Sequence, residues 1–316
     1  MHSIPLPLVA SDPLPGAEAE LAWMKGSGET ELACRIWRSP EPRCVILYLH
    51  GIEGHSQWFE PTAKVLRESG MTIYATDRRG AGLNTEHRGD IPDWKTFLCD
   101  VEMMLRKIDL MHPGKPIVLF ANCWSAKAAA VLANRSHSYA DKKPPVKLAG
   151  LIMTCPAIVT TADFDPFTKL KIAFCTFASE RLKQRLWPIP LTTEMLTDNP
   201  VYRQYLEEDP LRLKYATARF FRETFILGLL SQFVARSIEL PLLVLQAEKD
   251  QIVDTEKLSA WFQAVGSKDK QWKLFARSTH SLDFDATWFN DYTELLIQWL
   301  RARELTPEPS ELRRLG

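Results

Sequence analysis

The feature that most constrains the fold is an alternation of short apolar runs with segments that carry apolar residues on one helical face. Runs rich in β-branched and aromatic residues predict buried strands, and apolar residues recurring every three or four positions predict helices that cover them. The runs, in chain order, are CVILYLHG, MTIYATD, PIVLFA, KLAGLIMTC, PLLVLQAE and QWKLFA. Strands that alternate with helices predict an α/β fold with a mostly parallel sheet.

Helices are predicted between these strands and after the last of them. The expected helices are at about 57–69, at 94–108, in the alanine-rich segment after Cys123, at 254–265, and in a final segment that includes Trp288, Phe289, Tyr292, Leu295, Leu296 and Trp299. Before the first apolar run, the segments AELAWMK and TELACRIWR flank GSGE. This arrangement predicts an antiparallel hairpin at the start of the fold.

The alternation breaks once, between about residues 157 and 238. This stretch has helical periodicity and many aromatic residues, but it contains no convincing strand. Its segment 216–234 is apolar on nearly every side, so part of that helix must be buried. We expect a helical insertion that lies over the carboxyl edge of the sheet.

Composition narrows the classes of function. Lys+Arg and Asp+Glu number 39 each in 316 residues, so no overall field attracts nucleic acid. The six cysteines show no CxxC pair and no metal-ligand spacing, which predicts free thiols in a reducing compartment and no metal. The first twenty residues lack the basic segment and the continuous apolar segment that are typical of a signal peptide. No apolar run approaches the ~20 residues that a membrane span needs. We expect a cytoplasmic protein without a transmembrane segment.

The stretch ANCWSA, at the end of one predicted strand and the start of a helix, is the first candidate for chemistry. A strand-to-helix turn of this kind exposes a nucleophile only if the residues two before and two after it are small. With Cys123 at the centre, these residues are Ala121 and Ser125. With Ser125 at the centre, they are Cys123 and Lys127, and lysine fits poorly. The small-residue requirement therefore favours Cys123 over Ser125.

ANCWSA resembles the nucleophile elbow G-x-S-x-G of the α/β-hydrolase superfamily, with cysteine in place of serine. The stretch LHGIEGHSQWFEPTAKVLRESG is similar to the HG-x-x-x-HS loop of its monoacylglycerol lipase, lysophospholipase and serine aminopeptidase-like branch. DRRGAGLN, residues 77–84, resembles the D-x-R-G-x-G-x-S loop of that branch, which is mainly structural. The resemblance covers about residues 20–302, including LTDNPVYRQYLEEDPL, and implies an α/β-hydrolase fold with a mostly parallel eight-stranded sheet and an inserted helical lid.

Two later segments supply the remaining members of a triad. PLLVLQAEKDQIVD resembles the segment that carries the acid, which implies Asp250, and ARSTHSLDFD resembles the segment that carries the base, which implies His280. Nucleophile, acid and histidine then follow the chain order of this fold. Asp254 is an alternative acid, but it is also the expected N-cap of helix 254–265.

The resemblance assigns a role to each residue. Cys123 attacks as a thiolate, His280 acts as base and then activates water, and Asp250 orients the imidazole. The backbone N–H groups of Ile52 and Trp124 form the oxyanion hole.

Neighbouring polar residues are expected to have simpler roles. We expect His50 and His55 to shape the oxyanion loop with Gly51, and Ser125 to support the elbow. We expect Lys127, Asp283 and Asp285 to lie on solvated faces. Glu53 is expected either to point to solvent or to disfavour anionic substrates.

The expected domains are a core at 1–156 and 239–302, a helical lid at 157–238 and a polar tail at 303–316. We expect a cofactor-free enzyme that acts on an apolar small-molecule acyl substrate, with transient contact between the lid and a membrane surface. The first hypothesis is a hydrolase of esters or thioesters through a Cys-His-Asp triad. An acyltransferase or cyclase with the same nucleophile is the second, and a non-catalytic binding protein is the third.

Overall fold

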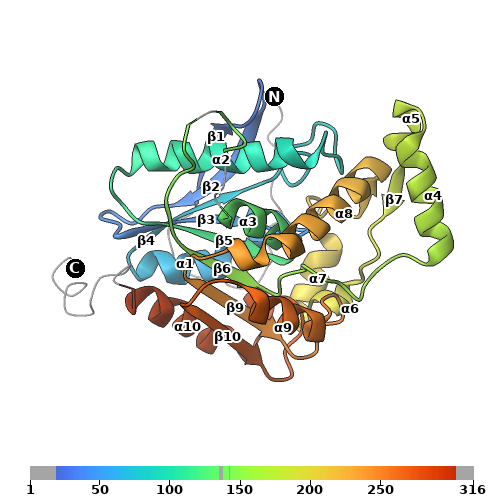
Figure 1. Cartoon of the computed structure of the whole chain (residues 1–316). Helices are drawn as coiled ribbons and strands as arrows, with labels where there is room; N and C mark the ends of the chain where they lie inside the picture. The colour runs from blue at the N-terminus through green and yellow to red at the C-terminus, as the bar shows by residue number, and fades with distance from the viewer. Residues whose placement is uncertain (1–18, 135–137, 142, 304–316) are drawn as a thin grey trace.

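The structure is a computed structural model that describes residues 19–134, 138–141 and 143–303. Eight strands form one sheet in the order β1-β2-β4-β3-β5-β6-β9-β10 (Figure 1). The strands are β1 (Glu20–Lys25), β2 (Glu31–Trp37), β3 (Cys44–Leu49), β4 (Met71–Thr76), β5 (Ile117–Asn122), β6 (Leu148–Thr154), β9 (Leu242–Ala247) and β10 (Lys270–Phe275). Strand β2 is antiparallel to both β1 and β4, and the remaining neighbours are parallel. The predicted hairpin, the strands and the mostly parallel α/β sheet are confirmed.

Helices cover both faces of this sheet, as the sequence predicts. They are α1 (Glu60–Glu68), α2 (Trp94–Met111), α3 (Ala126–Ala133), α9 (Thr255–Ala264) and α10 (Phe289–Arg301). The apolar residues form one core under α2, α3 and α9 and a second core under α1 and α10. The helix predicted at 57–69 begins with a 3₁₀ turn (Ser56–Phe59) before α1. Asp254 caps α9, because its side chain accepts a hydrogen bond from the Lys257 N–H.

The segment between β6 and β9 is mainly helical. It contains α4 (Pro166–Phe177), α5 (Glu180–Lys183), β7 (Leu186–Pro188), α6 (Thr193–Leu196), α7 (Pro200–Glu208), β8 (Tyr215–Thr217) and α8 (Ala218–Phe233). The expectation of no strand here is wrong, since β7 and β8 pair antiparallel. Each has only three residues, which is too short for a periodic pattern. In Figure 1, α4 and α5 lie at the right margin of the molecule, away from the sheet.

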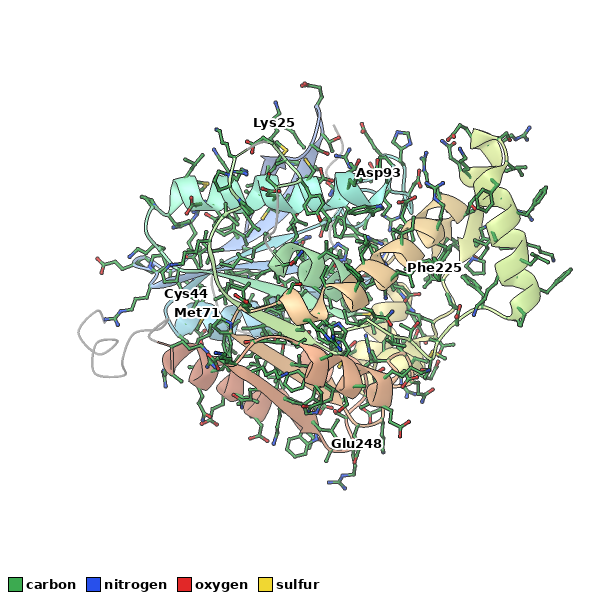
Figure 2. The ribbon with its side chains drawn as sticks, in the orientation of Figure 1. Lys25, Cys44, Met71, Asp93, Phe225 and Glu248 are labelled. Carbon is green, nitrogen blue, oxygen red and sulfur yellow. The ribbon has the colours of Figure 1, made fainter. Side chains whose placement is uncertain are left out.

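Helix α8 is buried on one side only, although its sequence is apolar on nearly every side. Phe220, Leu227 and Gly228 are buried, and α8 contacts α3 and α4. Phe225 and Leu229 are exposed instead (Phe225 is labelled in Figure 2). No helix of the described chain combines the length and the apolar character needed to cross a membrane.

Candidate active site

The turn after β5 holds Cys123 in a strained backbone conformation. The φ angle of Cys123 is 51°, in the left-handed region that residues with a Cβ rarely adopt. A 3₁₀ turn (Cys123–Ser125) leads directly into α3. The side chain of Cys123 approaches the next loop closely, because a Cβ at Gly51 would lie 3.1 Å from the Cβ of Cys123. The sharp strand-to-helix turn expected at ANCWSA is therefore present, and a side chain at position 51 would press tightly against it.

Ser125 lies in the same turn but has a different environment. Its hydroxyl is buried and donates a hydrogen bond to the backbone carbonyl of His50. This bond ties the turn after β5 to the end of β3. The contact fits the supporting position expected for Ser125.

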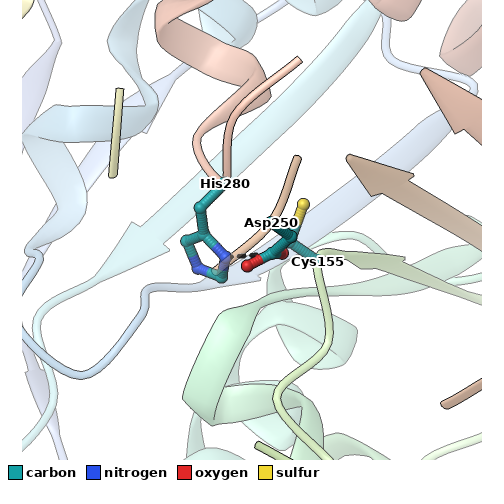
Figure 3. A group of neighbouring side chains, drawn as sticks. All are labelled: Cys155, Asp250 and His280. Carbon is teal, nitrogen blue, oxygen red and sulfur yellow. Dashed lines mark hydrogen bonds and ion pairs between the residues drawn. The ribbon is translucent and has the colours of Figure 1, made fainter. Parts of the chain in front are cut away.

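Asp250 and His280 come from the loops that follow β9 and β10, and the structure brings them together. His280 Nδ1 and Asp250 Oδ2 are 2.8 Å apart (Figure 3). The other carboxylate oxygen accepts the N–H groups of Ile252 and Val253, at 2.8 and 3.0 Å. Burial favours the neutral carboxyl, but His280 and these N–H groups outweigh it and lower the pKa of Asp250. The carboxylate is thus charged and fixed against the ring.

The imidazole of His280 has its second nitrogen directed away from Asp250. This Nε2 is buried and has no hydrogen-bond partner among the described residues. Burial alone would lower the pKa of His280, but the Asp250 carboxylate and the Cys123 sulfur together hold this pKa well above its usual value. His280 and Cys123 also line one cavity with Gly51 and Ile52. The surroundings of His280 therefore favour its protonated imidazole.

That cavity is small. It offers about 20 Å³ to water, and a single water needs roughly 10–15 Å³. Its walls include Leu191 and Leu196 from the segment between β6 and β9. A molecule larger than water therefore fits only if the walls of this cavity move.

Cys155, at the end of β6, is a neighbour of the pair that the sequence reasoning missed. Its sulfur, an Asp250 oxygen and a His280 nitrogen lie within 4.8 Å of one another (Figure 3). Burial, and then the nearby Asp250 charge, raise the pKa of the Cys155 thiol well above its usual value. Because metals bind thiolates and Asp250 already bonds His280, this group suits an acid–base pair better than a metal. The adjacency of β6 and β9 in the sheet was the signal that could have found it.

The loop after β3 is shaped by His50. Its Nε2 accepts the Arg78 N–H at 3.0 Å, so its Nδ1 carries the proton and donates to the Gly51 carbonyl at 2.8 Å. Burial, reinforced by Arg78, lowers the pKa of His50 to about 3 and keeps the ring neutral. Arg78 also donates to the Ile52 carbonyl at 2.6 Å. These bonds hold the backbone of residues 50–52 against Cys123.

The same loop is anchored to the segment between β6 and β9. His55 Nε2 and Trp58 Nε1 each lie 2.7 Å from Asp209 Oδ2. His55 therefore shapes this region through hydrogen bonds, as expected. The loop at 77–84 is structural, as expected, because the Asp77 carboxylate accepts the N–H groups of Ser56 and Leu83.

The expectation that Glu53 points to solvent is wrong, because its side chain is buried and paired, whereas the expectation that it disfavours anionic substrates stays a prediction. Glu53 is 3% exposed, and Oε2 lies 2.7 Å from Arg212 Nη2. The Glu53 carbonyl also accepts the Leu213 N–H at 2.9 Å. Burial raises the pKa of Glu53, and the Arg212 charge opposes that rise. Glu53 thus joins the loop after β3 to residues 212–213.

Three residues expected on solvated faces are instead buried. Lys127 is 6% exposed, and its ammonium donates to the Ala157 carbonyl. Asp283 accepts hydrogen bonds from Thr62 and Tyr292, and burial raises its pKa to about 6. Asp285 accepts the N–H groups of residues 287 and 288 at the start of α10. Each partner is distant in sequence or lies in the backbone, which side-chain periodicity does not reveal.

Trp124 follows Cys123 and packs into the core on the α8 side. Its ring stacks on Phe220 with centroids 5.1 Å apart, and its Nε1 donates to Thr224 at 3.0 Å. This packing fixes the peptide between Cys123 and Trp124. The N–H of Trp124 belongs to the first turn of the helical segment that begins at Cys123. Such N–H groups have no partner within the helix and are suited to binding an anion.

Comparisons with known proteins agree with this architecture. The human monoglyceride lipase is 24% identical over 255 residues, which cover 79% of this chain and 80% of that protein. Phospholipase YtpA of Bacillus subtilis is 22% identical over 251 residues, covering 78% of this chain and 91% of its own.

Solved structures give the same fold. A soluble variant of the Saccharomyces cerevisiae monoglyceride lipase, solved with a substrate analogue, superposes with a TM-score of 0.78 at 18% identity. The superposition covers 96% of this chain and 100% of that one. The monoacylglycerol lipase of Paleococcus ferrophilus gives a TM-score of 0.75 at 20% identity, covering 87% and 100%.

A family profile matches the largest part of the described chain. The match runs over residues 40–287, from before β3 to beyond His280, and the family is described as "Serine aminopeptidase, S33" (Hydrolase_4). Strands β3 to β10, the turn at Cys123 and the loops at Asp250 and His280 all lie within it. The chain belongs to this family of α/β-hydrolases.

Proposed function

We propose that the protein hydrolyses ester or thioester bonds of apolar acyl substrates, with Cys123 as nucleophile, His280 as base and Asp250 as the orienting acid. The observation that carries this proposal is the position of Cys123 at a strained turn beside His280, whose Nδ1 is held by Asp250 at 2.8 Å. Backbone strain at a non-glycine residue is characteristic of functional sites. A non-catalytic relative that only binds a ligand would not need this backbone strain or the charged histidine.

In the proposed reaction, the Cys123 thiolate attacks the acyl carbonyl carbon and forms a C–S bond. The carbonyl electron pair moves to oxygen, and the N–H groups of Ile52 and Trp124 stabilise this oxyanion. When the oxyanion collapses, the bond to the leaving alcohol or thiol breaks, and the leaving group takes a proton from His280. Water then gives a proton to His280 while it attacks the thioester, and the C–S bond breaks to restore the thiolate.

The substrate class rests on the relatives and on the apolar walls of the site. Relatives with this fold include monoglyceride lipases and a phospholipase. Residues 157–238 are proposed as the lid over a core formed by 1–156 and 239–302. Residues 1–18, 135–137 and 142 of that core, and all but the first residue of the expected tail at 303–316, lie outside the described residues. Leu191 and Leu196 from the proposed lid line the cavity beside Cys123. We therefore assign an acyl chain, rather than a charged group, to the space that opens when the lid moves.

Helix α4 supports transient contact with a lipid surface. Its residues Phe167, Leu170, Phe174 and Phe177, here named the α4 stripe, recur every three or four positions and are all exposed. Lys169 and Lys171 lie on the same helix and complement an anionic surface. A lipid surface would supply an insoluble substrate directly to the lid. We also assign the protein to the cytoplasm, since all six cysteines are free.

One experiment tests the proposed function against acyl transfer and against binding alone. The protein is incubated with p-nitrophenyl esters and acyl-thioesters of several chain lengths, and acylated peptides are identified by mass spectrometry. We expect an acyl group on Cys123 together with release of free acid. Cys123→Ala abolishes both, whereas the matched Ser125→Ala variant retains the acylation.

The other outcomes identify the alternatives. Acylation with slow hydrolysis that amines or alcohols accelerate would assign acyl transfer or cyclisation. Acylation that survives Cys123→Ala and disappears in Ser125→Ala would refute the nucleophile. The absence of acylation and turnover with every substrate would assign a non-catalytic binding protein.

A further inference from the structure

The cavity beside Cys123 is lined by a tyrosine to which the proposed reaction gives no role. Tyr48 lies near the end of β3 and pairs in register with Phe120 of β5, three positions before Cys123. Its side chain is 3% exposed and lines the same cavity as Cys123 and His280. The tyrosine therefore lies beside the strand that ends in the proposed nucleophile, and its side chain reaches the proposed reaction centre.

The ring of Tyr48 is held in place by two aromatic neighbours. It stacks on Phe59 with centroids 3.7 Å apart and planes inclined by 8°, and Phe120 packs against it edge-on at 5.5 Å. Ser281 also lines the cavity, but a serine hydroxyl rotates freely and has no fixed direction. The packed ring of Tyr48 thus presents its hydroxyl at one fixed position.

The hydroxyl of Tyr48 forms no hydrogen bond with another described residue. It keeps access to solvent, unlike the sealed indole nitrogens of Trp37 and Trp299. Burial, and then the Asp283 and Cys123 charges, raise the pKa of Tyr48 well above its usual value, so the hydroxyl stays neutral. A neutral phenol can both donate and accept a hydrogen bond. Buried polar groups without a partner are uncommon, so this hydroxyl has capacity for a ligand of the cavity.

Other polar side chains of the cavity are already bonded elsewhere. Glu53 pairs with Arg212, Trp58 donates to Asp209, and Asp283 accepts from Thr62. His280 resembles Tyr48 instead, because its Nε2 has no partner among the described residues. Since the cavity offers only about 20 Å³ to water, a water inside it lies close to the groups that line it. Such a water needs at least two polar partners, and Tyr48 and His280 can supply them.

We propose that the Tyr48 hydroxyl holds the water that hydrolyses the acyl-enzyme, accepting one of its hydrogens in a hydrogen bond while His280 takes the other as a proton. The water oxygen forms a C–O bond with the thioester carbonyl carbon and keeps the hydrogen that faces Tyr48. The C–S bond then breaks, its electron pair returns to the Cys123 sulfur, and the free acid leaves. Tyr48 itself is unchanged by the step. The inference rests on the proposed function, because it concerns the second half of that reaction.

This role decides whether the acyl group goes to water or to another acceptor. An acyl-thioester reacts with amines, thiols and alcohols as well as with water. A water that is held and oriented at the carbonyl has an advantage over acceptors that arrive from solution. Tyr48 therefore directs the thioester on Cys123 toward hydrolysis.

Stopped-flow kinetics with p-nitrophenyl butyrate separate the two halves of the reaction. The burst of p-nitrophenol reports acylation of Cys123, and the later linear phase reports hydrolysis of the acyl-enzyme. Tyr48→Phe removes one oxygen and keeps the stacked ring. We expect an unchanged burst rate and a linear phase slower by about 3–10-fold, the effect of one neutral hydrogen bond. Hydroxylamine, which attacks the thioester without a held water, should restore the linear phase.

Tyr74→Phe is the matched control. Its hydroxyl bonds Arg38 and His112 and does not line the cavity, so both phases should remain at the wild-type rate.

The remaining outcomes overturn the inference. Equal slowing of both phases in Tyr48→Phe would assign the hydroxyl to the oxyanion, to the thiolate or to structure alone. An unchanged linear phase, or a loss that occurs in Ser281→Ala instead, would remove Tyr48 from the hydrolysis step. Failure of the proposed function is distinguishable, because wild-type protein would then give neither a burst nor an acyl group on Cys123 in mass spectra.

Discussion

The buried pair between Glu53 and Arg212 allows a quantitative test of how the loop after β3 is held. Arg212→Met removes a guanidinium whose side chain is 5% exposed and leaves Glu53, at 3%, without its partner. Breaking a buried pair from one side costs about 3–5 kcal/mol. Arg212 also donates to Thr193 and to the Leu206 carbonyl at 2.9 and 3.2 Å, and these two bonds add about 2 kcal/mol. The expected total of about 5–7 kcal/mol is a large fraction of the ~5–15 kcal/mol typical of a folded protein.

The measurement is urea unfolding followed by tryptophan fluorescence, at constant m-value. Arg38→Met is the matched control. Arg38 pairs with Glu20 at 2.7 Å, but both side chains are exposed, so the expected cost is below about 1 kcal/mol. Adding Glu53→Gln to Arg212→Met removes the unpaired carboxylate. We therefore expect the double variant to be more stable than Arg212→Met alone.

The effect also depends on pH with a definite sign. Burial raises the pKa of Glu53 even in the presence of Arg212, and the loss of Arg212 raises it further. A carboxyl with a raised folded-state pKa stabilises the fold when protonated, and this contribution is lost as pH rises. The loss in free energy of unfolding caused by Arg212→Met should therefore become smaller as the pH falls from 7 to 5. Equal costs for Arg212→Met and Arg38→Met, or a deficit that grows on acidification, would refute the reasoning.

Three further predictions concern other regions. Burial raises the pKa of Asp283 to about 6, so its protonated carboxyl stabilises the fold below about pH 4, and this stabilisation is lost as the pH rises through 6. Relative to Asp283→Asn, the free energy of unfolding of the wild-type protein should fall by about 3 kcal/mol between pH 4 and 7 in urea titrations. Gly150→Ala places a Cβ 2.7 Å from the Trp299 ring and should cost about 1–3 kcal/mol, read as a lower urea midpoint. Phe174→Asp with Phe177→Asp should abolish cosedimentation with anionic vesicles while leaving turnover of a soluble p-nitrophenyl ester intact; unchanged vesicle binding would remove the α4 stripe from the proposal.

The sheet and its covering helices were predictable because each element carries its own local pattern. Strands such as β3 and β5 are continuous apolar runs, and helices such as α2 and α10 have a clear apolar face. Asp250 and His280 were implied by the resemblance of their segments to those of the α/β-hydrolases, and the ends of the neighbouring parallel strands β9 and β10 do meet at one edge. The structure brings these two side chains together at 2.8 Å.

The buried polar residues were not predictable in the same way. Glu53 is 159 positions from Arg212, and Asp283 is 221 positions from Thr62. A charged residue in a loop or on a short helix has a solvated face as its default environment, and only a distant partner overrides that default. Lys127 was expected to be solvated for the same reason, because the sequence around a lysine one turn into an alanine-rich helix does not indicate that α8 packs over it. Single-sequence patterns therefore located the strands but not the polar contacts that connect them.

The left-handed backbone at Cys123 has a consequence for the evolution of stability in this chain. A residue with a Cβ in this conformation costs about 1 kcal/mol or more relative to glycine. Cys123→Gly should therefore relieve strain even as it removes the thiol, so the turn is a place where a less active protein can be a more stable one. Directed evolution for thermal tolerance alone should drift toward glycine at this position, and, with the role proposed for Cys123, only selection that includes turnover should keep the sulfur.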